Sequence, residues 1–143
     1  MKVLFDTNVW LDIVLGREGF YLDSFMALVD CLDESDEICM AATSLKDVFF
    51  IVERMESAEV AYEAVGKMLE LARALTVDDW VCRKAVKLER PDYEDGIVAA
   101  AALSDEVDCI VTRDAAAFQN LNIRRYTPTE FIKERGVEVI DLP

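Results

Sequence analysis

The chain has 143 residues, 53% of them hydrophobic, and a formal net charge of −14 at pH 7. This length and hydrophobic content predict a single domain over residues 1–143 with a sizeable core, and they exclude a disordered chain. The negative charge excludes a protein that coats nucleic acid through a broad basic surface, since that kind of phosphate binding needs many lysines and arginines.

Cysteine and histidine usage limits the kinds of metal site. Histidine is absent, and the four cysteines lie far apart, at Cys31, Cys39, Cys82 and Cys109. Zinc bound by imidazole or thiolate is therefore not expected, and any metal would be Mg²⁺ or Mn²⁺ held by carboxylates and water. Scattered cysteines, with neither an export signal nor a segment that could span a membrane, predict a cytoplasmic protein with no membrane partner.

Hydrophobic patterns in the first half of the chain alternate between short strands and helices. Val3–Phe5 is an apolar run of strand-forming residues, typical of a strand buried on both faces. Helical periodicity follows directly after Asp6-Thr7-Asn8. The predicted strands are 3–5, 38–42 and 75–77, and the predicted helices are 9–15, 20–32, 43–54 and 58–74.

The second half continues this alternation. A helix capped at 78 or 79 reaches 88, and after Pro91 another starts at Asp92 and ends at 103 or 104. Thr127-Pro128-Thr129-Glu130 is a well-formed start for a last helix, which Gly136 ends. The other predicted elements are a strand at 107–112, a helical turn at 115–118, an extended piece at 123–126 and a tail or edge strand at 137–140.

The resulting order, β-α-α-β-α-α-β-α-α-β-α-β-α, predicts a three-layer α/β sandwich. Strands that alternate with helices form a parallel sheet with helices on both faces. In such a sheet, the carboxyl end of each strand and the start of the next helix lie at one edge, where ligands bind.

Acidic residues fall at these strand–helix junctions: Asp6, Asp47, the pair Asp92 and Asp95, and Asp114. Each has a simpler explanation as a helix cap, and Ser44-x-x-Asp47 and Asp92-x-x-Asp95 have the spacing of capping boxes. Caps have no need to converge, whereas a two-metal site needs several acidic oxygens close together. If the first strand is central, these carboxylates meet and repel one another unless a divalent cation binds, which favours Mg²⁺ or Mn²⁺.

Four stretches of the sequence together form a recognisable pattern: 3–8 (VLFDTN), 42–47 (ATSLKD), 92–100 (DYEDGIVAA) and 110–114 (IVTRD), the last followed by Phe118. On these stretches, and over nearly the whole sequence, the chain resembles the PIN-domain family, and within it the VapC-type toxins and their prokaryotic relatives. This resemblance implies a central parallel five-stranded sheet in the order 3-2-1-4-5 and a Mg²⁺- or Mn²⁺-dependent endoribonuclease with one or two ions.

The resemblance also implies roles for particular residues. The catalytic acids would be Asp6, Asp47, Asp95 and Asp114, and the same four, with Asp92, would be the metal ligands. Thr7, Asn8 and Thr112 would orient ligands or water. Because the family more often has Glu at the position of Asp47, this shorter side chain would reach a metal through water.

Basic residues suggest where RNA would lie. Arg83, Lys84, Lys87 and Arg90 follow one face of the helix before Asp92, and Arg113 adjoins Asp114. One interpretation is a track for the RNA backbone, and the other is a solvated helix face paired with nearby acids. Tyr93 and Trp10 are candidates for stacking on bases or, alternatively, core residues.

Partners follow from the resemblance as well. Such toxins dimerise and are inhibited by an antitoxin whose peptide enters a groove near the first two helices. Those helices are rich in apolar residues, which belong either to that interface or to the ordinary core: Trp10, Val14, Leu15, Phe20, Tyr21 and Phe25.

The leading hypothesis is thus a metal-dependent ribonuclease, the toxin of a toxin–antitoxin pair. The alternative is a PIN-like module that binds RNA or protein without cleaving it, which the net charge and Asp47 keep open. A haloacid-dehalogenase-type phosphotransferase would carry a second Asp where Asn8 stands. A response-regulator receiver would need a phosphoacceptor at the third strand, for which Asp78 is a weak match.

Overall fold

A computed structural model describes residues 1–88 and 92–138 and contains one parallel sheet of five strands. The strands are β1 (Lys2–Phe5), β2 (Glu37–Ala41), β3 (Arg73–Leu75), β4 (Cys109–Val111) and β5 (Arg124–Tyr126). Their order is β3-β2-β1-β4-β5, and every neighbouring pair is parallel. The predicted fold class, element order and central position of the first strand are therefore confirmed.

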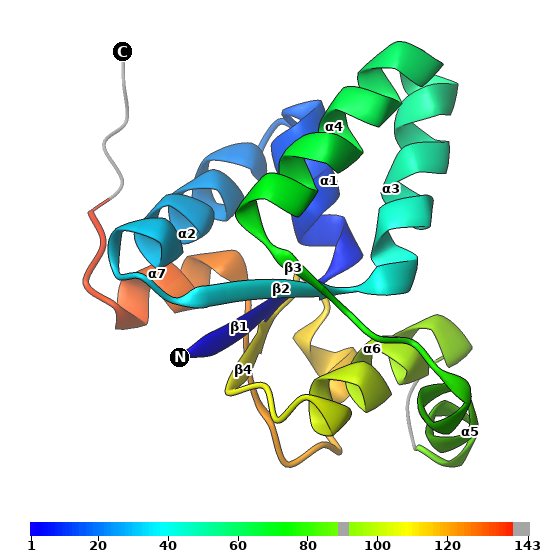
Figure 1. The fold of residues 1–143 in the computed structure, drawn as a ribbon. Coiled ribbons are helices and arrows are strands. Elements are labelled where there is room, and N and C mark those ends of the chain that lie inside the picture. The colour runs from blue at the N-terminus through cyan, green and yellow to red at the C-terminus, as the bar shows by residue number, and fades with distance from the viewer. Residues whose placement is uncertain (89–91, 139–143) are drawn as a thin grey trace.

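Helices cover both faces of the sheet, as Figure 1 shows. One face packs against α1 (Thr7–Leu15), α2 (Tyr21–Asp33), α3 (Ala42–Met55), α4 (Ala58–Leu71) and α7 (Pro128–Glu134). The other packs against α5 (Asp79–Lys87), α6 (Tyr93–Ser104) and the short 3₁₀ helix η1 (Ala115–Phe118). Alternate residues of β1 enter the two cores, Val3 and Phe5 on one face and Leu4 on the other. No helix in the described parts of the chain is long and apolar enough to cross a membrane.

The predicted boundaries around β3 are wrong. The helix predicted at 58–74 ends at Leu71, and the strand predicted at 75–77 is Arg73–Leu75. The run after Leu71 favours helix locally, but Ala74 and Leu75 pair in register with Met40 and Ala41 of β2. Backbone pairing with the sheet therefore overrides the local helical preference.

The predicted tail strand at 137–140 is also not seen where it can be judged. Val137 and Glu138 form no strand, and 139–140 lie outside the described residues, as do Arg90 and Pro91. The cap at Thr127 is confirmed, because its hydroxyl oxygen accepts the backbone N–H of Glu130 at 3.1 Å.

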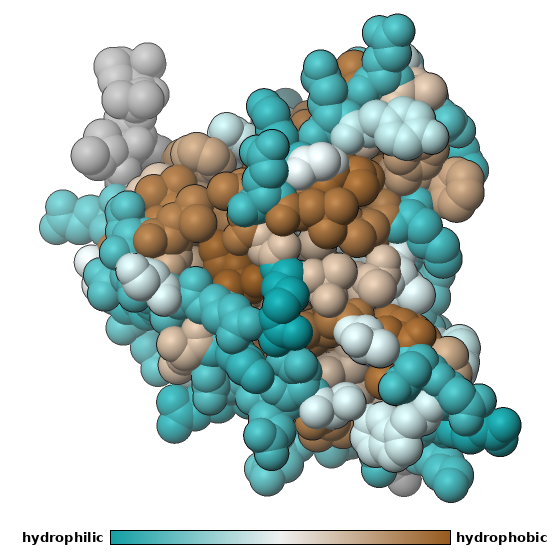
Figure 2. Space-filling view, in the orientation of Figure 1, coloured by the Kyte–Doolittle hydropathy of each residue, from teal (hydrophilic) through white to brown (hydrophobic). Residues whose placement is uncertain are grey.

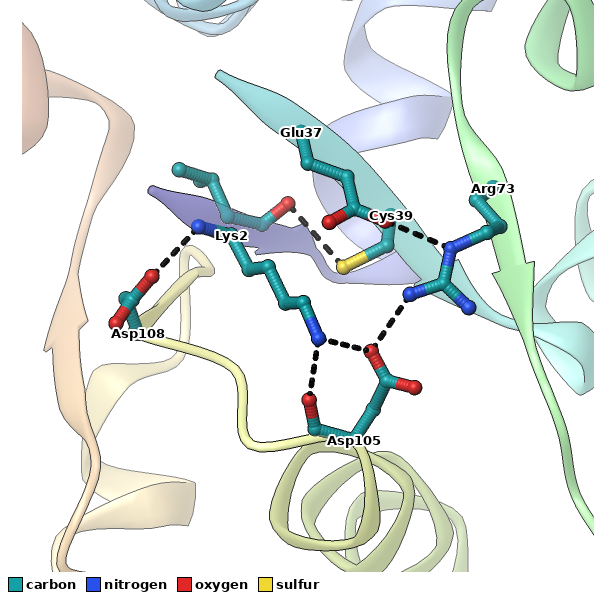
Figure 3. A network of polar contacts seen from close by, with 7 residues as sticks. Lys2, Glu37, Cys39, Arg73, Asp105 and Asp108 are labelled. Carbon is teal, nitrogen blue, oxygen red and sulfur yellow. Dashed lines mark hydrogen bonds and ion pairs between the residues drawn. The ribbon is translucent and has the colours of Figure 1, made fainter.

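A polar network ties the amino-terminal ends of the strands to the end of α6 (Figure 3). Asp105 accepts hydrogen bonds from Lys2 Nζ at 3.1 Å and from Arg73 Nη2 at 2.7 Å. Arg73 also donates to Glu37 at 2.7 Å, and the backbone N–H of Lys2 donates to Asp108 at 2.6 Å. These charges stabilise the edge of the sheet opposite to the one where the predicted site residues lie.

Candidate functional site

A cleft of about 600 Å³ opens at the carboxyl edge of the sheet, where β1 leads into α1 and β2 leads into α3. It also borders the start of α6. The cleft is lined by three of the predicted acids, Asp6, Asp47 and Asp95. Ligands bind at this edge in parallel α/β sheets because strand ends and helix starts leave polar backbone groups there.

Asp6 ends β1 and is buried, with 6% of its surface exposed. One carboxylate oxygen accepts the backbone N–H of Thr7 at 2.8 Å, and the other accepts the hydroxyl of Thr112 at 2.8 Å. Burial raises the pKa of Asp6, and the negative charges of Asp114 and Asp92 add to this rise. The hydrogen bonds from Thr112 and Thr7 oppose it. Asp6 is therefore both a helix cap and a carboxylate held among like charges.

Asp95 lies in the first turn of α6. Burial raises its pKa to about 7, and the charges of Asp92 and Asp6 contribute to the rise. The charge of Asp114 acts in the same direction, as does a hydrogen bond with the Asp92 side chain. Four of the predicted acids thus lie near enough to repel one another.

Asp92 and Asp114 differ in how their carboxylates are used. Asp92 Oδ1 accepts the backbone N–H of Asp95 at 2.8 Å, so its predicted role as a helix cap is confirmed. Asp114 precedes η1 but makes no capping hydrogen bond with its side chain. Its backbone N–H instead donates to the hydroxyl of Thr112 at 3.0 Å. The alternative explanation of Asp114 as a cap is therefore wrong.

Asp47 lines the cleft but is paired with a lysine. Lys46 Nζ lies 2.7 Å from Asp47 Oδ1, and this hydrogen bond raises the pKa of the Lys46 ammonium. The predicted capping box with Ser44 is wrong, because α3 starts at Ala42 and has no side-chain cap. Ser44 is buried and accepts a hydrogen bond from the Thr7 hydroxyl at 2.8 Å.

A divalent cation suits the chemistry of these donors, which are all carboxylate oxygens. Asp6 and Asp95 have raised pKa values because desolvation and neighbouring like charges disfavour their ionised forms, and a cation would relieve that repulsion. Within residues 1–88 and 92–138, however, no three acidic or thiol side chains already surround a common point. Binding a metal would therefore require the carboxylates to turn toward one another.

The predicted basic track lies on α5, outside the lining of the cleft. Arg83 is exposed and pairs with Asp79 at 2.7 Å, while Lys84 is half-buried and Lys87 exposed. Arg113 points elsewhere, because its Nε lies 2.8 Å from Asp12 on α1. Contact with RNA by these residues stays a prediction.

The two aromatic candidates, Trp10 and Tyr93, differ in how exposed their side chains are. Trp10 is 1% exposed and donates from its indole to the carbonyl of Phe5 at 3.1 Å. The alternative that Trp10 is a core residue is therefore confirmed, and the one in which it stacks on bases is wrong. Tyr93 is 45% exposed and lines the cleft, with its hydroxyl donating to the Cys82 carbonyl at 2.9 Å. A role for Tyr93 in stacking stays a prediction.

Sequence reasoning did not assign three polar residues near the site. Lys46 and Glu94 line the cleft, and Asp12 is completely buried on α1. Asp12 had a visible signal, since it is the one charged residue in the helical stretch 9–15. Lys46 and Glu94 had none, because charged residues in the first turn of a helix are usually solvated.

A second, apolar groove of about 370 Å³ lies between α1, α2 and α4. Figure 2 shows hydrophobic side chains gathered over α2 and α4. Of the predicted apolar stripe, Trp10, Val14 and Phe25 line this groove, and Phe25, Phe20 and Tyr21 are each more than a third exposed. The stripe is thus divided between core and surface.

Comparisons with known proteins agree with this fold. The profile of the PIN domain matches residues 2–116. One similar solved structure is VapBC2 from Rickettsia felis bound to a DNA fragment from its promoter, with 12% identity and a TM-score of 0.68, covering 89% of this chain and 98% of that one. Another is VapBC-1 from nontypeable Haemophilus influenzae, with 17% identity and a TM-score of 0.68, covering 90% of this chain and 99% of that one. A third is Mycobacterium tuberculosis VapC20, a sarcin-ricin loop cleaving toxin, with 14% identity and a TM-score of 0.64, covering 85% of this chain and 98% of that one.

At these identities the structural likeness establishes a shared fold with the VapC toxins. No curated protein sequence matches the chain. The profile covers most of the sequence, including the ends of β1 and β4 and the start of α6. The chain therefore belongs to the PIN domain family.

Proposed function

We propose that this chain is an endoribonuclease that uses Mg²⁺ or Mn²⁺ and is the toxin of a toxin–antitoxin pair. The observation that carries the proposal is the gathering of four carboxylates at one edge of the sheet, where Asp6 and Asp95 have raised pKa values. Membership of the PIN domain family supports it, as does the fold shared with VapC20, a sarcin-ricin loop cleaving toxin.

In this proposal Asp6, Asp95 and Asp114 hold the cation, and Asp92 is a further ligand. Asp47 takes part through water, because its carboxylate is paired with Lys46. When bound, a divalent cation supplies an acidified water for attack on the phosphodiester and neutralises charge on the leaving oxygen.

The neighbouring hydroxyl and amide groups orient these ligands. Thr112 donates to Asp6 and accepts from the backbone of Asp114, so one hydroxyl connects two of the acids. Thr7 holds the start of α1 against Ser44 of α3. Asn8 accepts the backbone N–H of Arg113 at 3.2 Å, which connects α1 to the turn after β4.

RNA would approach from the side of α5. Lys84 and Lys87 have no ion-pair partner in the described parts of the chain, and Lys87 is exposed. Their charges would offset the repulsion between phosphates and a protein with net charge −14. Tyr93, at the rim of the cleft, offers a ring on which a base could stack.

An antitoxin would cover the apolar groove between α1, α2 and α4. Exposed hydrophobic residues at its rim favour a protein partner over solvent; they include Phe25, Val60 and Leu71. The VapBC structures that share this fold, and a toxin–antitoxin complex from Klebsiella pneumoniae, support a partner of that kind. The homodimer stays a prediction, which light scattering of the purified chain would test.

A second candidate is a PIN-like module that binds RNA or protein without cleaving it. One observation favours it: Lys46 pairs with Asp47 inside the cleft, where this carboxylate would otherwise be free for a cation. Retained RNA binding without hydrolysis would identify this function.

The test is hydrolysis of structured and single-stranded RNAs with Mg²⁺ or Mn²⁺. Asp6→Asn and Asp95→Asn should each lower the cleavage rate at least about a hundredfold, a loss of several kcal/mol of transition-state stabilisation. Asp33→Asn is the matched control, because Asp33 is an exposed acid at the opposite edge of the sheet. Activity that survives both site variants would refute the assignment.

A further inference from the structure

A buried carboxylate with no place in the proposed metal site lies on α1. Asp12 is 0% exposed, and its Oδ2 lies 2.8 Å from Arg113 Nε and accepts a hydrogen bond from Ser24 at 3.2 Å. Arg17 lies farther away, with Nη1 3.8 Å from Oδ1. Removing a carboxylate from water is unfavourable by several kcal/mol, so the position needs an explanation.

Stability alone does not explain the pair. Neither Asp12 Oδ1 nor Arg113 Nε has a well-aligned hydrogen bond within residues 1–88 and 92–138. Buried ion pairs often stabilise a protein no more than an apolar pair of the same size would, but they can fix one arrangement of the chain.

Arg113 is held on several sides. Its guanidinium carbon lies 4.1 Å from the centre of the Phe20 ring, at the start of α2, and its backbone N–H donates to Asn8 Oδ1 at 3.2 Å. Arg113 is also the residue directly before Asp114. A shift of the Arg113 backbone would therefore pass directly to a proposed metal ligand.

Three contacts connect the turn 112–114 to successive parts of α1. The Asp6 carboxylate accepts from Thr112, Asn8 accepts from the backbone of Arg113, and Asp12 pairs with the Arg113 side chain. Because Asp6 stands at the start of α1 and Asp114 at the end of the turn, these contacts fix the distance between the two acids.

We propose that Asp12 and Arg113 are positioning residues that hold Asp114 in place relative to Asp6 for cation binding. This inference rests on the proposed function. Neither residue touches the cation in this scheme. Arg113 acts inside the protein, through Asp12 and Phe20, instead of on the RNA backbone.

The test is Mn²⁺ binding, measured by titration calorimetry without RNA. The double variant Asp12→Leu/Arg113→Met replaces the ion pair by an apolar pair, so it should melt within about 5 °C of the wild type. It should nevertheless bind Mn²⁺ about ten- to a hundredfold more weakly, because a loss of this size follows when a residue that orients a metal ligand is changed. Asp12→Asn, which keeps the shape and the hydrogen bond from Ser24, should weaken binding in the same direction by a smaller factor.

A double-mutant cycle separates positioning from a general loss of structure. In the Asp12→Leu/Arg113→Met background, Asp114→Asn should change Mn²⁺ affinity by no more than about twofold, because Asp114 is already misplaced. Asp95→Asn should weaken binding by the same factor as in the wild type. Equal effects of Asp114→Asn in both backgrounds would overturn the inference.

The control is a similar ion pair far from the cleft. Asp30 lies 2.7 Å from Arg135 Nε and also has a buried oxygen without an aligned hydrogen bond. Asp30→Asn should lower the melting temperature and leave Mn²⁺ affinity unchanged. If the wild type binds no Mn²⁺, the proposed function and this inference both fail. If Mn²⁺ binding depends on Asp6 and Asp95 but is unchanged by substitution of Asp12 and Arg113, only this inference fails.

Discussion

Asp95 lies half-buried at the start of α6, and burial raises its pKa to about 7, with Asp92 and Asp6 adding to the rise. In the unfolded chain the same carboxyl has a pKa near its ordinary value of about 3.9. Between about pH 4 and pH 7, the native state therefore holds a proton on Asp95 that the unfolded state has released. The stability contributed by that proton is complete below about pH 4 and is lost as the pH rises toward 7.

Asp95→Asn should therefore stabilise the metal-free protein at neutral pH. After allowance for solvent screening at this half-exposed site, the gain is on the order of 1 kcal/mol, or about 3–5 °C in melting temperature. Thermal melts in a chelating buffer at pH 5.5 and pH 8 would measure it. The gain should be larger at pH 8, and an equal gain at both pH values would mean that ionisation of Asp95 is not its cause.

Cysteine reactivity offers a second test at the scale of single residues. Cys31, Cys39 and Cys109 are at most 1% exposed, so reagents do not reach them. Burial also raises the pKa of each thiol to about 12, so none is ionised at pH 8. Cys82 is only half-buried and lines the cleft. A thiol reagent should modify Cys82 alone in the folded protein, as peptide mapping would show, and all four cysteines after denaturation.

At the scale of elements, α5 and α6 begin in the same way but in different electrostatic surroundings. Asp78 caps α5 by accepting the N–H of Val81 at 3.0 Å, and Asp92 caps α6 by accepting that of Asp95 at 2.8 Å. The charge of Asp92 also raises the pKa values of Asp95 and Asp6. Asparagine is as good a cap as aspartate, so an Asp→Asn change isolates the charge.

Asp92→Asn should thus raise the free energy of unfolding of the metal-free protein, whereas Asp78→Asn should leave it within about 0.5 kcal/mol of the wild type. Urea denaturation of both variants would measure the difference. Equal effects of the two substitutions would mean that like-charge repulsion at the start of α6 is negligible.

Most elements could be predicted from the sequence because each carries its own signal. The order of strands and helices and the caps at Asp92 and Thr127 follow from local patterns. The position of β3 could not be predicted, because the pairing of Ala74 with Met40 is a contact with a distant strand. For the same reason the sequence leaves Trp10 open between base stacking and the core, and its packing against Phe5 places it in the core.

The candidate site could be predicted as a set of positions but not as a geometry. Topology alone brings Asp6, Asp95 and Asp114 to one edge of the sheet. Side-chain details such as the pairing of Asp47 with Lys46, or the direction of Arg113 toward Asp12, depend on packing that has no local signal in the sequence.

For the whole molecule, the formal charge of −14 implies that native charges repel one another on average. Raising NaCl from about 0.01 M to about 1 M shortens the screening length from about 30 Å to about 3 Å. The melting temperature should therefore rise with NaCl in a chelating buffer, and scanning calorimetry would measure the change. A melting temperature that falls with NaCl would mean that ion pairs such as Arg135–Asp36 outweigh the repulsion.

The hydrogen bond between Asp6 and Thr112 joins residues 106 positions apart. During synthesis, the central strand β1 leaves the ribosome long before β4, so Asp6 and Asp114 meet only after four of the five strands have been translated. A nascent chain that ends before β4 lacks Thr112 and Asp114, so its set of acids is incomplete. The complete set of acids can therefore assemble only late in synthesis.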